Sequence, residues 1–299
     1  MMLDYHLHLL RHGEDGPYRA DDVRAYAAKA HGEGVGEIAI TEHLFRFRQA
    51  DALLAGWWND DPSDSLRTQT ARYWAEHATG DLDSYVEAIV TASGEPGDVP
   101  GARIKLGLEV DYYPGRMGDV ARLLAPYPFD VLLGSVHWIG SWGFDQFDDP
   151  VVGDEWLART RGAGDIDKVW DHYCDAIDEM AASGVCDVLA HPDLIKVTGM
   201  FPGGDRSGWY ERLAAAAARN NVCAEVSSAG WRKPVGEAYP SVDLLRAFHD
   251  AGVGVTTASD AHDLATVADG TQRLRALVTN AGYTELTGFT RRHRESRSI

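Results

Sequence analysis

The sequence alternates short apolar segments with segments of helical pattern, and this alternation is its strongest constraint on the fold. Seven apolar segments, most of them with β-branched residues and several with Gly or Pro close by, are typical of buried parallel strands. The segments between them place apolar residues three and four positions apart, as amphipathic helices do. Strands that alternate with helices predict a parallel sheet covered by helices, which is an α/β fold. The predicted strands are residues 1–8, 35–43, 104–113, 130–138, 186–192, 222–228 and 253–262, and the clearest helical patterns are residues 20–34, 167–184, 207–221 and 241–252.

The number of predicted strands favours one closed or nearly closed barrel over two small domains. Single α/β barrels commonly have lengths near the 299 residues of this chain, and a hydrophobic content of 44% is enough for a large core. An open, doubly wound sheet remains an alternative. We predict one domain over residues 1–290, followed by the basic segment 291–299, which we interpret as a solvated, disordered tail.

Most of the predicted strands end on residue types that bind metal ions. In a parallel barrel the carboxyl ends of the strands converge on one face, so residues distant in sequence would meet around one pocket. The first strand carries two such residues, His6 and His8, whose side chains point the same way because they are two positions apart. The complete set is His6, His8, His43, Glu109, His137, His191, Asp260 and His262.

A single histidine in an apolar segment is more often a hydrogen-bonded core residue than a metal ligand. We assign such structural roles to the histidines in helical or terminal segments. The others gather at strand ends, where burying many ionisable groups together is costly unless cations neutralise them. The clustering therefore predicts a metal site. The histidines with structural roles are His31, His77, His172, His249 and His293.

The composition narrows the range of partners. The chain has 28 basic and 46 acidic residues and a net charge of −18, which disfavours extended nucleic acid and anionic membranes. Its cysteines, Cys174, Cys186 and Cys223, form no CxxC pair and indicate neither a disulfide framework nor a zinc finger. With no long apolar segment and no room for a leader before the first strand, we expect a cytoplasmic protein with a small-molecule partner. An acidic protein that binds a phosphate ester needs local positive charge, which metal ions supply.

Several motifs, taken in order, resemble the polymerase-and-histidinol-phosphatase (PHP) family: "HLH", "TEH", "GLEVDYYPG", "YPFDVLLGSVHWIG", "AHPDL" and "SDAH". The likeness extends from Asp4 to about His262 and, within the family, is to the histidinol-phosphate phosphatases. The sequence "GSVH" after "YPFD", and "AGWRKPVGEAYPS" between the last two strands, are more specific than an HxH motif alone. The resemblance implies a distorted (β/α)7 barrel with a trinuclear metal centre, in agreement with the seven predicted strands.

The resemblance also implies how the ligands are shared among the metals. The third metal needs a ligand from the loop after the first strand, where the family has a histidine six positions after the second histidine of HxH. This chain has Glu14 there, which we assign as the ligand by position, with His12 as a substitute. One metal would be held by His6, His8, Glu109 and Asp260, a second by the bridging Glu109 with His137 and His191, and the third by His43 and His262 with that loop ligand.

A mixed set of imidazole and carboxylate ligands is suited to zinc, manganese or iron. Two or three such divalent cations lower the pKa of a bound water and hold the phosphoryl oxygens, so that hydroxide attacks phosphorus. Glu109 and Asp260 would act in catalysis through the metals they hold, and Asp4 would orient the first-strand ligands through hydrogen bonds. The leaving alkoxide needs a proton, which either a water on the third metal or His262 would deliver.

Charged residues near the strand ends are candidates for binding the substrate. Arg232 and Lys233 follow the sixth strand, which ends without a ligand, and Lys196 follows "HPDL". Each of these three is a candidate for binding phosphate and is equally well explained as a solvated loop charge. Asp111 and Asp193 lie close to ligands and are candidates for binding a cationic amine of the substrate.

The segment from Leu44 to about Ser65 departs from the alternation, because it is rich in aromatic residues and arginine directly after a strand end. A long loop there would lie over the active face and act as a lid. Extra surface packing around Trp57 and Trp58 explains the same composition equally well.

We interpret the sequence as a metal-dependent phosphomonoesterase that hydrolyses L-histidinol phosphate to L-histidinol and phosphate in histidine biosynthesis. Two alternatives remain: a phosphoesterase acting on another small ester, such as a nucleotide or sugar phosphate, and a metal-binding domain without catalytic activity. The change at Glu14 is the observation that keeps the second alternative open. A polymerase-associated exonuclease is disfavoured by the net charge of −18.

Overall fold

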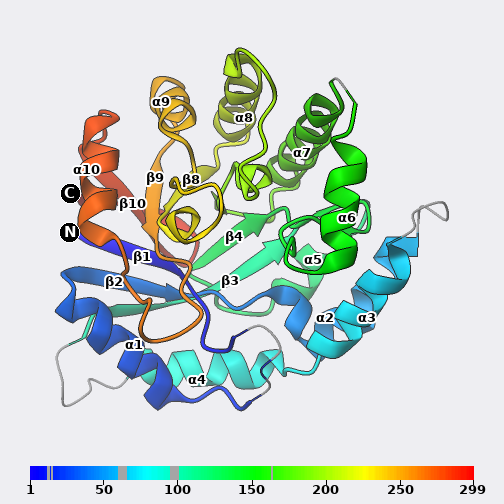
Figure 1. The fold of residues 1–299 in the computed structure, drawn as a ribbon. Helices are drawn as coiled ribbons and strands as arrows, with labels where there is room; N and C mark the ends of the chain where they lie inside the picture. The colour runs from blue at the N-terminus through cyan, green and yellow to red at the C-terminus, as the bar shows by residue number, and fades with distance from the viewer. Residues whose placement is uncertain (12–13, 15, 60–65, 95–100, 163) are drawn as a thin grey trace.

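The computed structural model describes residues 1–299 except 12–13, 15, 60–65, 95–100 and 163. Seven parallel strands form one sheet that curls into a nearly closed barrel, in the order β1-β2-β3-β4-β7-β8-β9 (Figure 1). All the strands predicted from the sequence are present, and the (β/α)7 barrel is confirmed. The strands are β1 (Met2–Leu7), β2 (Val35–Ile40), β3 (Arg103–Asp111), β4 (Val131–Ser135), β7 (Val188–Leu189), β8 (Cys223–Ser227) and β9 (Val255–Ala258).

The first and last strands of the sheet, β1 and β9, lie side by side at the seam of the barrel. They are joined by isolated contacts rather than by a regular ladder: the backbone N–H of His8 donates to the carbonyl of Ala261 at 2.8 Å. The Thr257 hydroxyl donates to the carbonyl of Leu3 at 2.7 Å. These contacts bring the two ends of the sheet together, so the open, doubly wound alternative is wrong.

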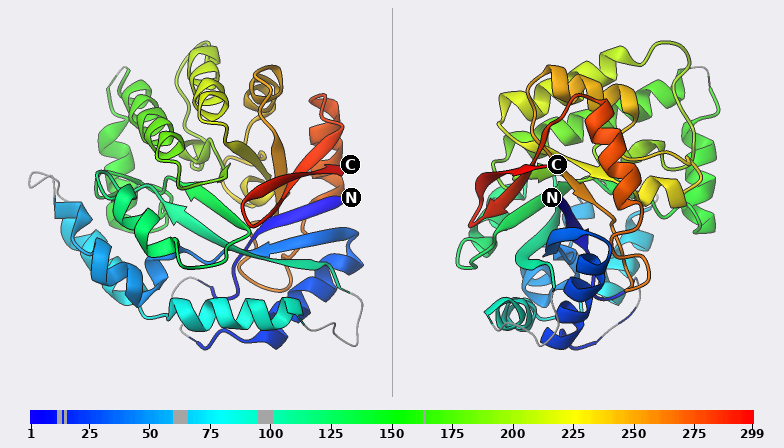
Figure 2. Two further views of the ribbon diagram at one scale, coloured as in Figure 1. Left: turned by 180° about the vertical axis from the view of Figure 1, so that it is seen from behind. Right: turned by 90° about the vertical axis from the view of Figure 1, so that its left-hand side faces the viewer.

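Helices surround the outer face of the barrel (Figures 1 and 2). The four clearest helical patterns correspond to α1, α7, α8 and α9. No helix in the described part of the chain combines the length and the apolar character needed to cross a bilayer. The helices are α1 (Ala20–Gly32), α2 (Arg48–Leu54), α3 (Arg67–His77), α4 (Leu82–Gly94), α5 (Met117–Leu124), α6 (Pro150–Arg159), α7 (Asp165–Ala182), α8 (Ser207–Arg219), α9 (Val242–Asp250) and α10 (Thr271–Asn280).

Helix α9 illustrates why these segments are helical. The Ser241 hydroxyl accepts a hydrogen bond from the backbone N–H of Leu244 at 3.4 Å and caps the first turn. Leu244 and Leu245, which precede Phe248 by four and three positions, are fully buried together with it. Burying an apolar side chain of this size contributes about 1.5–3 kcal/mol, which favours the helix that presents such a face.

The aromatic segment after β2 packs as part of the molecule in its described portion. It forms the short helices η1 (Leu44–Arg46), α2 and η2 (Trp57–Asn59), and residues 60–65 lie outside the described residues. Trp57 is buried, with its ring centroid 5.9 Å from that of Trp138 and 5.6 Å from that of Tyr113. These contacts favour the packing interpretation over a lid for the part of the segment that can be described.

The C-terminal segment forms a hairpin of β10 (Glu285–Thr290) and β11 (His293–Ser298), so the expectation of a disordered tail over 291–299 is not met (Figure 2). The hairpin lies at the amino ends of the barrel strands. Arg297 Nη2 is 3.3 Å from the buried carboxylate of Glu37, and Arg292 Nε is 3.0 Å from Asp187 Oδ2. Arg292 and Arg297 are therefore held by carboxylates from distant parts of the chain. No local pattern in the sequence indicates these contacts.

Candidate metal centre

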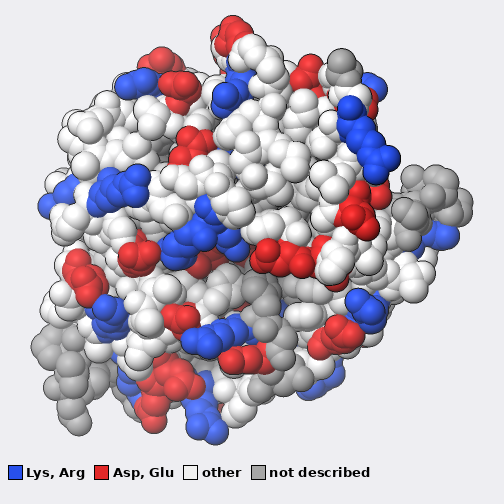
Figure 3. All heavy atoms as spheres, viewed as in Figure 1, with Lys and Arg blue, Asp and Glu red and all other residues white. Residues whose placement is uncertain are grey.

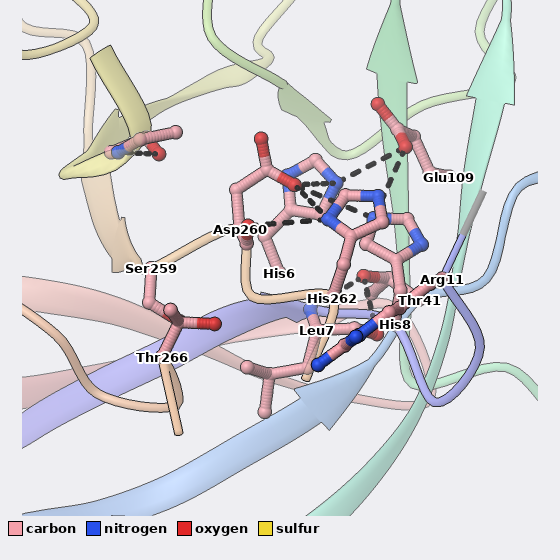
Figure 4. A network of polar contacts seen from close by, with 12 residues as sticks. His6, Leu7, His8, Arg11, Thr41, Glu109, Ser259, Asp260, His262 and Thr266 are labelled. Atoms are coloured by element: carbon pink, nitrogen blue, oxygen red, sulfur yellow. Dashed lines mark hydrogen bonds and ion pairs between the residues drawn. The ribbon is translucent and has the colours of Figure 1, made fainter. Parts of the chain in front are cut away.

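Glu109, in the carboxyl half of β3, is contacted by several buried histidines, and its carboxylate points toward His6 and His8 in Figure 4. Its Oε2 atom is 3.1 Å from His6 Nε2 and 2.7 Å from His43 Nδ1. Its Oε1 atom is 3.0 Å from His191 Nε2 and 3.6 Å from His137 Nε2. The carboxyl ends of several strands thus direct their polar side chains toward one carboxylate, as the parallel barrel predicts.

Asp260, just after β9, brings a second carboxylate to the same cluster. Its Oδ1 atom is 3.8 Å from His6 Nε2, 3.5 Å from His8 Nε2 and 3.7 Å from His262 Nδ1 (Figure 4). The ring of His8 lies between two other imidazoles, with centroids 4.1 Å from His262 and 4.4 Å from His43. All eight residues at the predicted strand ends therefore meet in one place.

The cluster contains several sets of atoms that could each hold one cation. In each set the ligand atoms lie within 4.8 Å of one another. Asp111, which the sequence analysis did not include among the ligands, belongs to one of them. The sets are His8, His43 and His262; His6, His8 and Asp260; His6, Glu109 and His191; and His43, Asp111 and His137.

The chemistry of these atoms fits divalent metal ions. Within the described residues, both ring nitrogens of His8 and Nδ1 of His191 are buried without a hydrogen-bond partner. Buried polar atoms without partners are costly, and imidazole nitrogens and carboxylate oxygens are ligands for zinc and similar cations. Cations bound among them would satisfy these atoms together.

Two residues of the cluster have backbone conformations that side chains other than glycine seldom adopt. His191 has a φ of 28° and Asp260 a φ of 52°. Such conformations cost free energy and persist where the surrounding structure requires them, frequently at functional sites. Here the left-handed backbone accompanies two side chains that point into the cluster.

Glu225 is a buried residue of the site that the sequence analysis missed. Its Oε2 atom is 2.8 Å from His6 Nδ1, and its Oε1 atom accepts a hydrogen bond from the backbone N–H of His191 at 3.2 Å. A carboxylate on the outer nitrogen of a ligating histidine orients the ring and leaves the other nitrogen for a metal. The available signal was a glutamate inside the apolar strand segment "VCAEVSS", which we treated as a strand without a ligand.

Asp111 and Asp4 also make contacts that differ from those expected. Asp111 Oδ1 lies 2.5 Å from His137 Nδ1, so this carboxylate is engaged by a histidine and is not free to bind a substrate amine. Asp4 does not hydrogen-bond to the first-strand ligands. It accepts hydrogen bonds from the backbone N–H and hydroxyl of Ser259, both at 2.7 Å, and from Ala268 N at 2.9 Å. Asp4 therefore orients the loop that carries Asp260.

The loop after β1 does not bring Glu14 to the cluster. Glu14 is exposed and belongs to none of the four sets of ligand atoms, and its carboxylate accepts a hydrogen bond from Arg11 N at 3.3 Å. Its substitute, His12, lies outside the described residues. The loop is held by the buried Arg46, which donates to the carbonyls of Arg11 and Glu14, and by Glu42, which accepts from the backbone of residues 9 and 10.

Electrostatics within the cluster favour protonated histidines when no cation is bound. Burial opposes a positive charge on His6, but the carboxylates of Glu225 and Glu109 outweigh it and hold the pKa of His6 well above its usual value. Burial likewise opposes a charge on His137, and the carboxylates of Asp111 and Glu109 raise its pKa to about 10. Protons and metal ions therefore compete for the same nitrogens.

Three other members of the cluster, Glu109, Asp260 and His262, have lowered pKa values. Burial alone would raise the pKa values of Glu109 and Asp260, but the surrounding histidines lower both well below their usual range. Burial and the neighbouring His8 lower the pKa of His262 to about 4. At neutral pH His262 is uncharged, which suits a metal ligand better than a general acid.

The predicted phosphate-binding residues have different surroundings. Lys196 is fully buried, with its Nζ atom 2.8 Å from each of Asp193 Oδ2, Glu237 Oε1 and the carbonyl of Ala238, so its three hydrogens are engaged within the protein. This geometry argues against Lys196 as a phosphate ligand and Asp193 as an amine ligand.

Of the other two candidates for binding phosphate, Arg232 and Lys233, only Arg232 lies at the cluster. Arg232 Nη2 donates to the carbonyl of Ser259 at 2.6 Å and is 3.3 Å from the carbonyl of Asp260. Its Nη1 atom is 3.0 Å from Asp269 Oδ2. Lys233 is exposed on the same loop. Arg232 therefore remains the better supported candidate for a contact with phosphate.

Two solved structures share this fold. Histidinol phosphate phosphatase from Lactococcus lactis, solved in complex with zinc, L-histidinol and phosphate, has a TM-score of 0.67 and 20% identity, and the match covers 98% of each chain. A structure from Listeria monocytogenes designated a histidinol phosphatase has a TM-score of 0.68 and 19% identity, and the match covers 91% of this chain and 99% of that one. At these identities the likeness establishes the fold.

Sequence comparison extends the likeness beyond the fold. The "Probable histidinol-phosphatase" of Deinococcus radiodurans is 31% identical over 264 residues, which cover 87% of this chain and 86% of the relative. The model of the PHP domain family matches residues 4–229, from β1 to the end of β8 and just beyond. This match includes the strand ends that supply six of the eight clustered residues, and the chain belongs to the PHP family.

Proposed function

We propose that this protein is a metal-dependent phosphomonoesterase that hydrolyses L-histidinol phosphate to L-histidinol and phosphate. The observation that carries the proposal is the buried cluster of imidazole and carboxylate groups around Glu109, whose sets of ligand atoms lie within 4.8 Å of one another and fit divalent cations. The relative from D. radiodurans and the L. lactis enzyme are named for this activity. We propose that the reaction serves histidine biosynthesis. Such a role fits a cytoplasmic enzyme.

Two or three divalent cations are proposed to bind the cluster, and the zinc in the L. lactis complex favours zinc over manganese or iron. When bound, they supply positive charge to the phosphoryl oxygens and lower the pKa of water, which is the chemistry that phosphate-ester hydrolysis needs. The proposed ligands are His6, His8, His43, Glu109, His137, His191, Asp260 and His262.

The chain's own residues prepare this site in three ways. Glu225 and Asp111 orient the rings of His6 and His137. Burial of the cluster excludes bulk water, so charges act there with less screening than at the surface. Arg232, fixed beside the Asp260 loop, is proposed to contact a phosphoryl oxygen through its guanidinium group. Acidic and basic side chains are interspersed on the face drawn in Figure 3. We therefore expect no nucleic-acid partner.

The test is phosphate release from L-histidinol phosphate, compared with a sugar phosphate, a nucleoside monophosphate and 4-nitrophenyl phosphate. Each is measured on protein loaded with zinc, manganese or iron and on protein treated with a chelator. We expect the largest kcat/KM for L-histidinol phosphate and its loss on chelation. Preference for another ester would support the alternative phosphoesterase, and no turnover with any metal would support a catalytically silent domain.

A further inference from the structure

Asp145 is an acidic residue beside the metal centre that none of the roles described so far uses. It follows a two-stranded ribbon of β5 (Trp138–Ile139) and β6 (Trp142–Gly143), which starts directly after His137. The backbone N–H of Phe144 donates to the carbonyl of His137 at 3.2 Å. Asp145 is thereby held close to His137, at the carboxyl end of β4.

The carboxylate of Asp145 has an oxygen atom without a partner. Its Oδ1 atom is buried and, within the described residues, makes no hydrogen bond. Asp145 belongs to none of the sets of metal-ligating atoms, and no described cationic side chain forms an ion pair with it. Asp111 and Asp193, by contrast, are engaged by His137 and Lys196. A buried carboxylate oxygen without a donor is costly unless a ligand supplies one.

A second unpartnered group lies near the same space. The hydroxyl of Tyr239 is buried and makes no hydrogen bond with the described residues, and the ring of Tyr239 is 6.3 Å from that of His191. Its backbone pairs with Ser227 at the carboxyl end of β8. Burial is the main cause of the raised pKa of Tyr239, and the negative charges of Asp193, Asp260 and Asp145 raise it further.

Aromatic side chains pack against the ribbon that precedes Asp145, because the Trp138 ring on β5 lies 5.8 Å from that of His137. The charge of Asp145 also contributes, after burial, to the raised pKa of Tyr73, whose ring centroid is 6.2 Å from that of Trp138. A negative group beside aromatic rings attracts an organic cation, because both the carboxylate and the ring faces interact favourably with positive charge. A molecule that carries both a phosphate and a cationic group matches the metal centre and Asp145 together.

We propose that Asp145 binds the positively charged organic group of the phosphomonoester whose phosphate lies at the metal centre. This inference rests on the proposed phosphatase function and deepens it, because it assigns the residue that selects cationic substrates. It gives to Asp145 the role that the sequence analysis assigned to Asp111 and Asp193. L-Histidinol phosphate, with its ammonium and imidazole groups, is a substrate of this class.

The experiment compares the zinc-loaded wild-type protein with Asp145→Asn and, as a matched control, Asp148→Asn, an exposed aspartate of the same loop. For each protein, kcat/KM is measured for two cationic esters, L-histidinol phosphate and phosphoethanolamine, and for the uncharged-chain esters propyl phosphate and 4-nitrophenyl phosphate. We expect Asp145→Asn to lower the ratio of cationic to uncharged substrates by about 10- to 100-fold, the range for one charged contact. Asp148→Asn should leave the ratio within about twofold.

Titration calorimetry measures the binding of L-histidinol to the same proteins without turnover. Asp145→Asn should weaken this binding by about the same 10- to 100-fold factor. An unchanged ratio, an equal loss for all esters, or no binding of L-histidinol to the wild-type protein would overturn the role of Asp145. If phosphoethanolamine proves the better substrate and Asp145→Asn removes that preference, the histidinol phosphate assignment fails while the role of Asp145 stands.

Discussion

At the scale of single residues, the site depends on carboxylates that need not touch a metal. Glu225 contacts both His6 Nδ1 and the backbone of His191, so one side chain influences two proposed ligands. His191 also has a left-handed backbone, with a φ of 28°. A contact to its N–H therefore helps to maintain a conformation that the residue would not adopt by itself.

We predict that Glu225→Gln weakens zinc binding by about 10- to 100-fold, the usual effect of changing a group that orients a ligating histidine. The neutral amide keeps the size of the side chain but removes the charge that polarises His6. Competition for zinc with a chromophoric chelator measures the affinity. The control is Glu211→Gln, an exposed glutamate on α8, which should bind zinc as the wild type does. Equal affinities for the two variants would contradict the role of Glu225.

The clustering of the proposed ligands could be predicted from the sequence because each one lies at the end of an apolar strand segment, and the parallel barrel brings those ends together. Asp145 and Glu225 could not be predicted in this way. Asp145 is placed by a ribbon whose pairing is not apparent from the sequence, and Glu225 faces His6 only because β8 lies near β1 across the barrel. The position of Glu14 was inferred from a motif spacing, and the folded loop turns its side chain outward.

At the scale of secondary-structure elements, the C-terminal hairpin differs most from expectation. Its arginines were interpreted as solvated charges because a basic segment has no local partner in the sequence. In the fold, Glu37 is fully buried and lies 3.3 Å from Arg297 and 3.0 Å from Arg103. Regular strands and helices follow from periodicity within a segment, whereas this hairpin is determined by carboxylates that distant segments contribute.

We predict that Arg297→Ala lowers the free energy of unfolding by about 1–3 kcal/mol, because it leaves the buried Glu37 with a weaker set of partners. Urea denaturation measures the change. Arg72→Ala removes an exposed arginine paired with Glu76 on α3 and should cost less than about 1 kcal/mol. Since the hairpin lies at the end of the barrel opposite the metal centre, kcat should stay near the wild-type value at temperatures where the variant is folded. Similar losses of unfolding free energy in the two variants would show that Arg297 contributes no more to stability than an exposed arginine.

At the scale of the whole molecule, metal binding, protonation and folding stability are linked. The pKa of His137 is raised to about 10, above the unfolded value near 6.5, so its proton stabilises the metal-free fold. That stabilisation is fully present below about pH 6.5 and is lost as the pH rises through about 10. A metal must displace this proton, so its affinity rises over the same interval.

We therefore predict that zinc binding to chelator-treated protein releases protons at pH 7 and becomes tighter between pH 6 and 9. Calorimetry in two buffers of different ionisation enthalpy measures the number of protons released. At 100 times its dissociation constant, zinc should add about 2.7 kcal/mol to stability and raise Tm by roughly 5–10 °C. Binding without proton release would show that the carboxylates do not hold protons on His6 and His137.

The position of β1 between β2 and β9 has a consequence for biosynthesis. Asp260 and His262 are synthesised some 250 residues after His6 and His8, and they lie beside them only after the seam has closed. A nascent or truncated polypeptide that stops before residue 260 thus lacks two of the eight proposed ligands, Asp260 and His262, and the carboxylate that faces His6 and His8. Acquisition of metal is therefore expected to be a late event, one that marks a chain whose translation has passed the last barrel strand.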